Sequence, residues 1–302
     1  MNTAELYSRI KAQGGAIRLP RTKIKLTGAD RVRYLNGQVS NDVRKLTPAA
    51  SMHACLMTAK GKMCADLFIT AAEDHLLVDA EPSLRESLAA RLERYIISDD
   101  VTLEDVSDSL FLVHILEGAE SPASQSRRYG RPGHDLWLPA GATNPLADSL
   151  PPIDEEMLEI LRIEAGVPRW GFELGEETIP VEAGLDRDAI DYHKGCYIGQ
   201  EVISRIKSIG HVNKELRGFI LLDGPPPAPG MRLHLPGGEG REAGWLTSAA
   251  HSFGLDRPVA LGYLKRGATG EVLEARPANE AENEAAVPSA SSVRVKELPI
   301  IP

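Results

Sequence analysis

The sequence has few of the residues that mark cross-linked, zinc-stapled or membrane-spanning proteins. Only three of its 302 residues are cysteines, and an odd number cannot pair completely within one chain. Cys55, Cys64 and Cys196 also lack the paired Cys-x-x-Cys spacing of a structural zinc site. The longest strongly apolar run, residues 110–116, is interrupted by His114 and falls far short of the ~20 residues of a membrane helix. We therefore expect no structural zinc and no membrane span.

Positive charge is also in deficit. The 43 acidic residues outnumber the 34 basic residues, which gives a net charge of −9. This balance disfavours nucleic acid and anionic membranes as partners, so an anionic ligand would need a local basic site. The first residues show no basic segment followed by an apolar one. We expect no secretory signal, a reducing compartment and a cytoplasmic location.

Common catalytic motifs are missing as well. The sequence has no GxxxxGK[ST] loop, no strand-linked GxGxxG, no HExxH and no GxSxG. Their absence excludes the commonest nucleotide-binding, metalloprotease and hydrolase classes. What remains is a globular chain of about two domain lengths, with 42% hydrophobic and 25% charged residues.

Short strand patterns alternate with short helical patterns in the first half of the chain. We expect strands near 17–19, 24–26, 52–58, 64–70, 101–103 and 110–116, and helices over 29–35, ending at Gly37, and over 83–97. Ser83 and Glu86 have the spacing of a capping box for the second of these helices. Residues 120–152 are rich in Ser, Gly, Pro and Ala, which predicts a loop with a single strand.

A hairpin is predicted where the strands 52–58 and 64–70 meet. With residues 60–61 at the centre of its turn, Cys55 lies opposite Asp66. Met57 then lies opposite Cys64. The two cysteines become diagonal neighbours with Cα atoms roughly 7–8 Å apart, which is too far for a relaxed disulfide. We expect both to be reduced core residues.

Strand patterns separated by Gly and Pro clusters fill the last third of the chain. They cover 218–222, 231–235, 243–246, 259–264, 271–275 and 293–298. This spacing predicts a separate small all-β domain. The low-complexity segment 277–292 is predicted to be a disordered connection.

A carboxylate interrupts the apolar stripe of a predicted helix that starts near Asp154 and ends near Gly166. Met157, Ile160, Leu161 and Glu164 follow helical 3-4-3 spacing. An unpaired buried carboxylate is costly. Glu164 therefore either pairs with an arginine, such as Arg162 or Arg169, or faces a cavity whose ligand supplies donors.

One cysteine lies in a setting that favours reactivity. The segment 194–201, KGCYIGQE, places Cys196 between two glycines and ahead of a predicted helix. A helix N-terminus and the neighbouring Lys194 ammonium would both favour thiolate over thiol. A purely structural cysteine is the alternative, and His193 and His211 are the unsupported partners for catalysis.

Three motifs resemble those of a known family. KGCYIGQE, followed by Val202-Ile203-Ser204-Arg205, resembles the signature of the YgfZ-type tetrahydrofolate-binding proteins, which are relatives of the aminomethyltransferase (T-protein) of the glycine cleavage system. Residues 35–43, LNGQVSNDV, look like the N-terminal motif of that family, and residues 161–166, LRIEAG, look like its LRxEAG helix. The resemblance covers roughly residues 17–298.

The resemblance implies an α+β fold in a three-part ring around a folate channel. Residues 1–110, together with 155–215, would form the N-terminal folate-binding domain, 111–154 a ferredoxin-like module with connecting loops, and 216–302 the C-terminal β-barrel. Glu164 matches the glutamate that holds the pterin in the transferases. Its carboxylate can accept hydrogen bonds from a pair of pterin N–H groups. The remaining candidates are Arg162, Asn41, Asp42, Tyr197, Gln200 and Arg205 for tetrahydrofolate or a derivative, and Cys196 and Lys194 for catalysis.

One departure separates the chain from the transferases. Their GGxxDD segment supplies a catalytic aspartate pair, whereas residues 61–66, GKMCAD, have Ala65 in place of the first aspartate. Alanine can neither accept nor donate a proton. The resemblance therefore implies a folate-binding accessory protein for assembly or repair of iron–sulfur clusters, with an aminomethyltransferase as the alternative and a folate sensor or store as a third reading. Its expected partners are reduced folate and iron–sulfur client proteins or a redox partner, where Cys196 either ligates iron transiently or exchanges disulfides.

Overall fold

A computed structural model describes residues 2–116, 123–145, 149–222, 227–236, 242–268, 272–277 and 293–298. The predicted disordered segment 277–292 lies almost entirely outside them. The chain divides into two compact units. The first unit comprises Met1–Asp154, Leu174–Val181 and Leu185–Gly210, and the second comprises Glu155–Glu173, Glu182–Gly184 and His211–Pro302.

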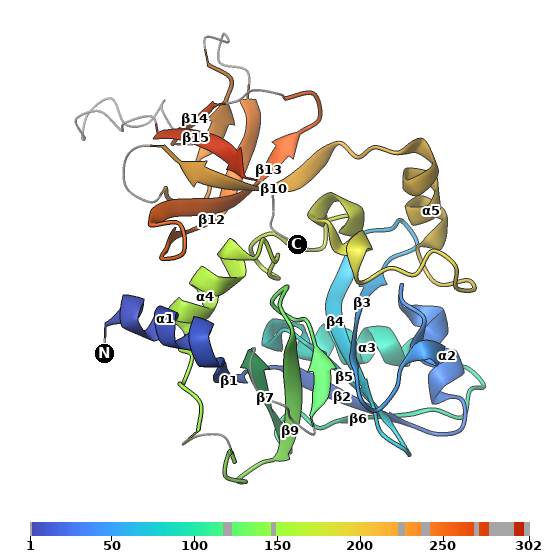
Figure 1. The fold of residues 1–302 in the computed structure, drawn as a ribbon. Helices are drawn as coiled ribbons and strands as arrows, with labels where there is room; N and C mark the ends of the chain where they lie inside the picture. Colours follow the sequence, from blue (N-terminus) through green and yellow to red (C-terminus); the bar gives the residue numbers. More distant parts are fainter. Residues whose placement is uncertain are drawn as a thin grey trace. The chain divides into compact units, whose positions relative to one another are not determined.

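The first unit contains a five-stranded antiparallel sheet with the strand order β3-β4-β5-β2-β6 (Figure 1). Its strands are β2 (Thr22–Thr27), β3 (Ser51–Met57), β4 (Met63–Ala71), β5 (Leu76–Ala80) and β6 (Thr102–Asp105). The helices of this unit include α2 (Arg31–Gln38), α3 (Arg85–Glu93) and α5 (Gln200–Ile209). Helix α3 packs against β2 and β6, where it buries Leu88 and Leu92.

A second, four-stranded sheet of the same unit has the order β1-β7-β9-β8. It is built from β1 (Gly15–Leu19), β7 (Leu110–Leu116), β8 (Ser124–Ser126) and β9 (Gly133–Pro139). Helix α1 (Thr3–Gln13) precedes it, with a capping box between Asn2 and Glu5. Short 3-10 helices complete the chain: η1 (Val43–Lys45), η2 (Pro82–Leu84), η3 (Pro180–Ala183) and η4 (Leu185–Arg187).

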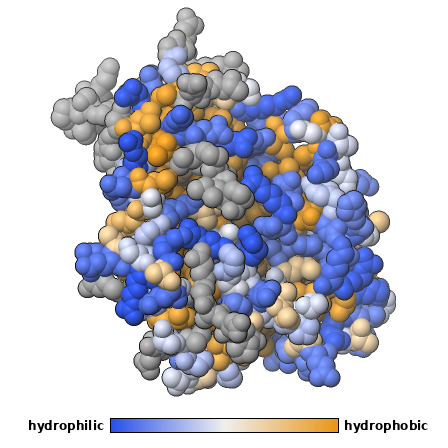
Figure 2. Space-filling view, in the orientation of Figure 1, coloured by the Kyte–Doolittle hydropathy of each residue, from blue (hydrophilic) through white to orange (hydrophobic). Residues whose placement is uncertain are grey.

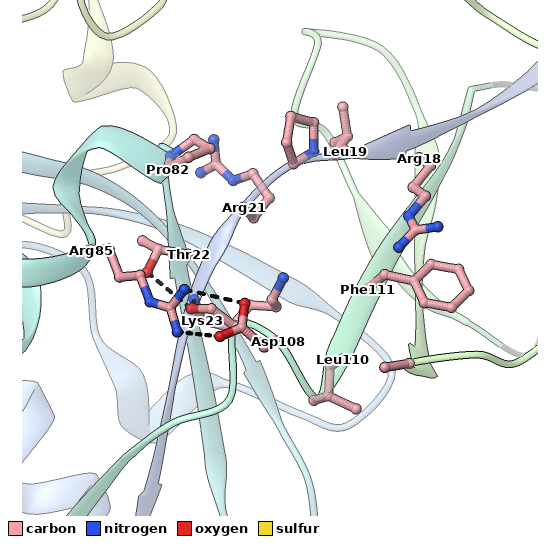
Figure 3. Close-up of a pocket in the computed structure, with 13 residues that line it drawn as sticks. Arg18, Leu19, Arg21, Thr22, Lys23, Pro82, Arg85, Asp108, Leu110 and Phe111 are labelled. Atoms are coloured by element: carbon pink, nitrogen blue, oxygen red, sulfur yellow. Dashed lines mark hydrogen bonds and ion pairs between the residues drawn. The ribbon is translucent and has the colours of Figure 1, made fainter.

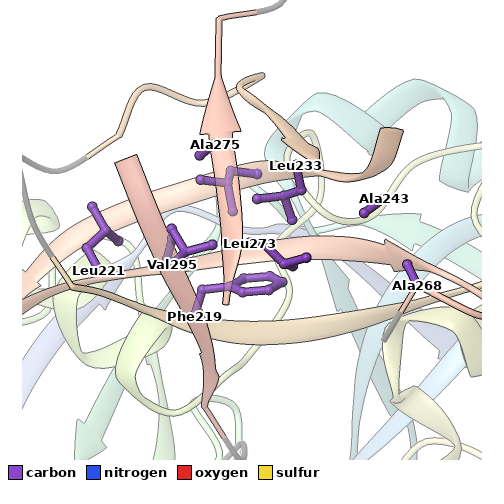
Figure 4. Close-up of a cluster of buried hydrophobic side chains, with 10 residues drawn as sticks. Phe219, Leu221, Leu233, Ala243, Ala268, Leu273, Ala275 and Val295 are labelled. Carbon is purple, nitrogen blue, oxygen red and sulfur yellow. The ribbon is translucent and has the colours of Figure 1, made fainter. Parts of the chain in front are cut away.

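The second unit is a closed six-stranded barrel with helix α4 (Glu155–Glu164) packed on β12 and β13. The barrel strands are β10 (Lys214–Leu221), β11 (Arg232–His234), β12 (Glu242–Ser252), β13 (Arg257–Lys265), β14 (Leu273–Arg276) and β15 (Val293–Leu298). Figure 4 shows part of its apolar core, in which Phe219, Leu233 and Val295 are fully buried. All six predicted strands of the last third are present, which confirms the all-β domain.

The predicted boundaries of two helices are wrong. Residues 82–84 form η2, so α3 begins at Arg85 with Leu84 as its N-cap and without the predicted Ser83 capping box. It ends at Glu93 rather than at residue 97. Helix α2 continues past Gly37 to Gln38, because the conformational cost of one glycine is only ~1 kcal/mol.

Two predicted strand patterns also need correction. A bulge between Leu56 and Met57 pairs Met57 with Met63 instead of Cys64, although Cys55 does lie opposite Asp66 as predicted. Residues 120–152 contain two strands, β8 and β9, rather than one. Pairing with β7 stabilises β9, and such tertiary contacts override the turn-forming composition of the segment.

On the face drawn in Figure 2, apolar residues are scattered among hydrophilic ones. Such scattering is normal for a globular surface. None of the helices in the described ranges is long and apolar enough to span a bilayer.

Candidate functional site

Lys194 anchors the signature segment 194–201. Its side chain is only 5% exposed. The ammonium donates to three carbonyls: those of Asn36 at 2.6 Å, Val39 at 2.7 Å and Asn41 at 2.7 Å. These carbonyls lie at or just beyond the C-terminus of α2, where carbonyl groups lack helical partners and a positive charge is favoured. Burial lowers the pKa of Lys194 to about 8.

Two glycines allow the signature segment to pack directly against the β3–β4 turn. Gly199 has φ +93°, and a Cβ there would lie 2.8 Å from the carbonyl oxygen of Thr58. Gly61, at φ +72°, faces Val202 of α5 in the same way. A side chain at either position would push the two segments apart. Gly195, by contrast, faces open space.

Cys196 is an exposed free thiol on this anchored segment. It lies three residues before Gly199, the N-cap of α5, and the helix macrodipole acts mainly within the first turn. All three N–H groups of Lys194 are engaged by carbonyls, so none remains for the sulfur. The two expected sources of thiolate stabilisation are therefore weaker than the sequence suggests, and exposure is the property that distinguishes this thiol.

The other two cysteines are also free thiols, as predicted. Cys55 is fully buried, and burial raises the pKa of its thiol well above the usual value. Cys64 is half-buried rather than a full core residue, and burial raises the pKa of its thiol too. Both environments disfavour the reactive thiolate.

Asn41 and Asp42 hold the loop that Lys194 contacts. The Asn41 amide donates to the carbonyls of His53 and Asp188 at 2.9 and 3.0 Å. Asp42 is 4% exposed and accepts from the guanidinium of Arg44 at 2.8 Å. The hydrogen bond from Arg44 lowers the pKa of Asp42.

The structure places the remaining signature candidates differently. Tyr197 is buried, with its ring 5.0 Å from the Lys194 ammonium, and burial raises its pKa well above the usual value. Gln200 is the first residue of α5 and is half-buried, whereas Arg205 lies on the exposed side of that helix. Tyr197 therefore joins Asn41, Asp42 and Lys194 in one packed group, and Arg205 faces solvent.

A cavity of roughly 530 Å³ opens beside this group, with Asn41 in its wall. His53 and Phe68 stack there with ring centroids 4.5 Å apart and planes 2° from parallel, because they are cross-strand partners in β3 and β4. The hydroxyls of Ser51 and Ser126 also line the cavity, buried and without a hydrogen-bond partner among the described residues. Orphaned hydroxyls next to a flat aromatic surface suit a planar, polar ligand.

A buried ionic network supports this wall. The Arg128 guanidinium lies 4.1 Å from the centroid of the Phe68 ring and donates to the carboxylates of Asp79 and Asp135 at 2.6 to 2.9 Å. The His114 ring is 2.8 Å from Asp135. Burial alone would raise the pKa of Asp135, but the Arg128 charge and the His114 contact hold it well below its usual value. Sequence reasoning missed this network, whose members come from separate strands and carry no local motif.

The GKMCAD segment lies in β4 at the position expected from the hairpin. Ala65 is 1% exposed and points into the core opposite Leu56. Asp66 lies 2.6 Å from a ring nitrogen of His53. The single carboxylate that remains in this segment is therefore paired with a histidine.

Glu164 and Arg162 lie in the second unit. Glu164 is half-buried and accepts from the Ser252 hydroxyl at 2.6 Å and from the amide of Gly254 at 3.4 Å. Arg162 is 2% exposed. Its five N–H groups all have protein acceptors, supplied by Glu159, Glu173, Val167 and Ser248. Arg162 thus joins α4 to β12, and the geometry leaves it no donor for a ligand.

The sequence and the fold of this chain are both similar to those of known proteins. Residues 214–291 match the family described as the glycine cleavage T-protein C-terminal barrel domain. The solved aminomethyltransferase T of Bartonella henselae superposes with a TM-score of 0.82 at 18% identity, over 99% of this chain and 89% of that one. The fold is therefore that of the T-protein, as the sequence resemblance implied.

Curated relatives include proteins with three different names. The chain is 28% identical to the mitochondrial iron-sulfur cluster assembly factor IBA57 homolog of Mycosarcoma maydis, over 68% of this chain and 57% of that protein. It is 27% identical to the tRNA-modifying protein YgfZ of Sodalis glossinidius, over 75% and 77%. It is 28% identical to the mitochondrial aminomethyltransferase of Gallus gallus, over 80% and 71%.

The chain is thus similar to YgfZ and aminomethyltransferase (GcvT) proteins over most of its length. It spans about half the length of the IBA57 homologues that it matches, 57% and 52% in the first two. Within this YgfZ/GcvT-like chain, the described residues contain no group of three His, Cys, Asp or Glu side chains that could hold a metal ion.

Proposed function

We propose that this protein is a folate-binding accessory factor in the assembly or repair of iron–sulfur clusters, and that Cys196 is its functional thiol. The observation that carries the proposal is the contrast among the three cysteines. Cys55 and Cys64 are held in surroundings that disfavour a thiolate, whereas Cys196 is exposed on a segment fixed by Lys194. A rigidly presented thiol suits transient ligation of iron or exchange with a partner's disulfide.

The relatives' names agree with this role at the coarser level. They include an iron-sulfur cluster assembly factor and a tRNA-modifying protein, which supports a role in one of those two areas. Client proteins, the redox partner and a cytoplasmic location belong to the proposal, since some relatives carry mitochondrial or chloroplastic names.

The cavity beside Asn41 is the proposed folate site of the first unit. The His53 ring, backed by Phe68, would stack on a flat pterin, and the hydroxyls of Ser51 and Ser126 would pair with its polar edge. When bound, a reduced folate supplies nitrogen atoms that carry one-carbon units. Glu164, in the second unit, is proposed separately as an acceptor for pterin N–H groups.

Arg162 and Lys194 are proposed as positioning residues. Arg162 has no N–H group left for folate, and Lys194 has none left for a substrate. Asp42, Tyr197 and Gln200 would act through the same packed segment. Arg205 is exposed on α5 and would meet the anionic tail of folate or a protein partner.

Complementation tests the thiol. In a strain that lacks the gene, Cys196→Ser should fail to restore the activity of iron–sulfur enzymes, while the matched control Cys64→Ser should restore it. Full restoration by Cys196→Ser would remove the thiol from the mechanism. Unchanged iron–sulfur enzyme activity in the deletion strain itself would favour a folate sensor or store instead.

Calorimetric titration with a reduced folate tests the proposed contacts of each unit separately. His53→Leu and Glu164→Gln should each weaken binding, because the first removes the ring proposed to stack on the pterin and the second removes the charge of the acceptor. Arg94→Gln, which changes an exposed arginine beside Tyr95, is the control and should leave the affinity for folate unchanged. Equal affinity for wild type and both variants would sink the assignment.

The aminomethyltransferase alternative is disfavoured by Ala65 and Asp66. The first offers no proton acceptor, and the carboxylate of the second is held by His53. We expect no methylenetetrahydrofolate to form from an aminomethyl donor above the background without protein. Turnover by the purified protein would restore the transferase reading.

A further inference from the structure

A second cavity, of about 580 Å³, lies in the first unit and shares no residue with the proposed folate site. It opens where β1 passes into β2, beside η2, the start of α3 and the beginning of β7 (Figure 3). Its wall carries four cationic side chains, Arg18, Arg21, Lys23 and Arg85, and one acidic side chain, Asp108.

Two of these cations are already neutralised by protein carboxylates. Arg21 pairs with Asp79 at 2.6 Å and with Glu81 at 2.9 Å. Arg85 pairs with the carboxylate of Asp105 at 2.6 Å and with that of Asp108 at 2.7 Å. These pairs hold the rim of the cavity in place and leave Arg18 and Lys23 as the available charges.

Lys23 is buried without a partner for its ammonium. The residue is 4% exposed, and its backbone is fixed by hydrogen bonds to Ser107 and Val106. Within the described part of the chain its ammonium makes no hydrogen bond and no ion pair. Burial lowers the pKa of Lys23, although the charges of Asp79 and Asp108 oppose that shift. The Nζ atom is not among the fully buried side-chain atoms that lack a partner, so the ammonium reaches the cavity, where a bound acceptor would offset the cost of burying the residue.

Arg18 provides the second available charge next to an aromatic surface. It is exposed, and its guanidinium lies 4.3 Å from the centroid of the Phe111 ring. It has no ion-pair partner among the residues that the structure describes. Leu19, Leu110 and the Phe111 ring form an apolar wall in the same cavity. Charge and a flat apolar surface therefore occur side by side.

We propose that this cavity binds a small organic anion, in which a phosphate or carboxylate group lies next to a flat apolar group. The anionic group would accept hydrogen bonds from Lys23 and Arg18, and the flat group would pack against Phe111 and Leu110. The volume lies within the ~300–1,000 Å³ of small-molecule sites. The site stands independently of the proposed folate function, since it uses none of the same residues.

Calorimetric titration of the full chain with phenyl phosphate tests the proposal. Benzoate distinguishes a carboxylate from a phosphate, inorganic phosphate removes the ring, and benzyl alcohol removes the charge. Phenyl phosphate or benzoate should bind, inorganic phosphate should bind at least tenfold more weakly, and benzyl alcohol should not bind. Lys23→Met should weaken the binding of phenyl phosphate at least tenfold and Arg18→Gln severalfold. Arg94→Gln, an exposed arginine of the same unit near Tyr95, should leave it unchanged.

Three results would overturn the site. The first is no binding of either aromatic anion up to about 10 mM, a concentration that would reveal even weak contacts. The second is equal binding by Lys23→Met and wild type. The third is equal weakening by Arg94→Gln, which would indicate a general charge effect. If Lys23→Met fails to fold, Arg18→Gln decides the matter, because that side chain is exposed.

Discussion

Lys194 and Lys23 are both buried lysines of the first unit, 5% and 4% exposed, and burial lowers the pKa of both. They differ in what surrounds the ammonium. Lys194 donates to three carbonyls, whereas Lys23 makes no such bond within the described residues and faces a cavity. Burial alone therefore does not assign a role to a charged residue. Lys194 stabilises a loop, whereas the ammonium of Lys23 is available to a ligand in the cavity.

The largest effect is expected from Lys194→Met. The variant keeps the apolar stem but leaves three buried carbonyls without a donor, which should lower the free energy of unfolding by about 3 kcal/mol or more. Urea denaturation measures the loss. Lys207→Met is the control, since that ammonium is exposed beside Tyr192 and should matter by less than about 0.5 kcal/mol. A loss below about 1 kcal/mol for Lys194→Met would erase the distinction between the two buried lysines.

A smaller loss should follow from Gly199→Ala, which disturbs the same segment without removing its charge. The new Cβ meets the Thr58 carbonyl at 2.8 Å, at φ +93°, so we expect a cost of about 2 kcal/mol in the free energy of unfolding. Gly195→Ala is the matched control, because that position faces open space. Thermal or urea unfolding of both variants checks the pair. Equal free energies of unfolding for Gly199→Ala and Gly195→Ala would show that the β3–β4 turn can move to accommodate the new Cβ.

Lys23→Met should have the opposite sign. Removing the partly desolvated ammonium of this buried residue and keeping its stem should raise the free energy of unfolding by about 1 kcal/mol at neutral pH. A rise in the unfolding temperature of the ligand-free protein would support this. A large loss would mean that Lys23 holds the structure as Lys194 does.

The smallest effect is the pH dependence of that gain. The pKa of Lys23 is lower in the folded protein than its usual 10.5, so the unfolded chain binds more protons in the window below 10.5. Stability of the wild type therefore rises with pH through this window, and its difference from Lys23→Met should shrink as pH approaches 10.5. Urea denaturation of both proteins at several values of pH measures the difference. A constant gap would contradict the assignment of the cost to the charge.

Local patterns predicted much of the fold. The barrel strands and β7 follow apolar alternation or continuous apolar runs, which neighbouring residues encode, and α4 follows from its 3-4-3 stripe. The bulge at Leu56 and the strand pairing of β9 depend on partners elsewhere in the chain and were missed. Helix α1 was missed too, although the capping box of Asn2 and Glu5 was a usable signal.

The candidate site divides in the same way. The resemblance of three motifs predicted the T-protein fold, and the position of Cys196 between two glycines was visible in the sequence, because motifs are properties of short segments. The surroundings of the charged groups of Lys194, Arg162 and Lys23 depend on tertiary contacts. The acceptors of Lys194 lie 153 to 158 residues away along the chain, and the cavity of Lys23 is walled by residues up to Ala140. The charge of a side chain follows from its residue type, but its hydrogen-bond partners depend on which distant segments the fold brings next to it.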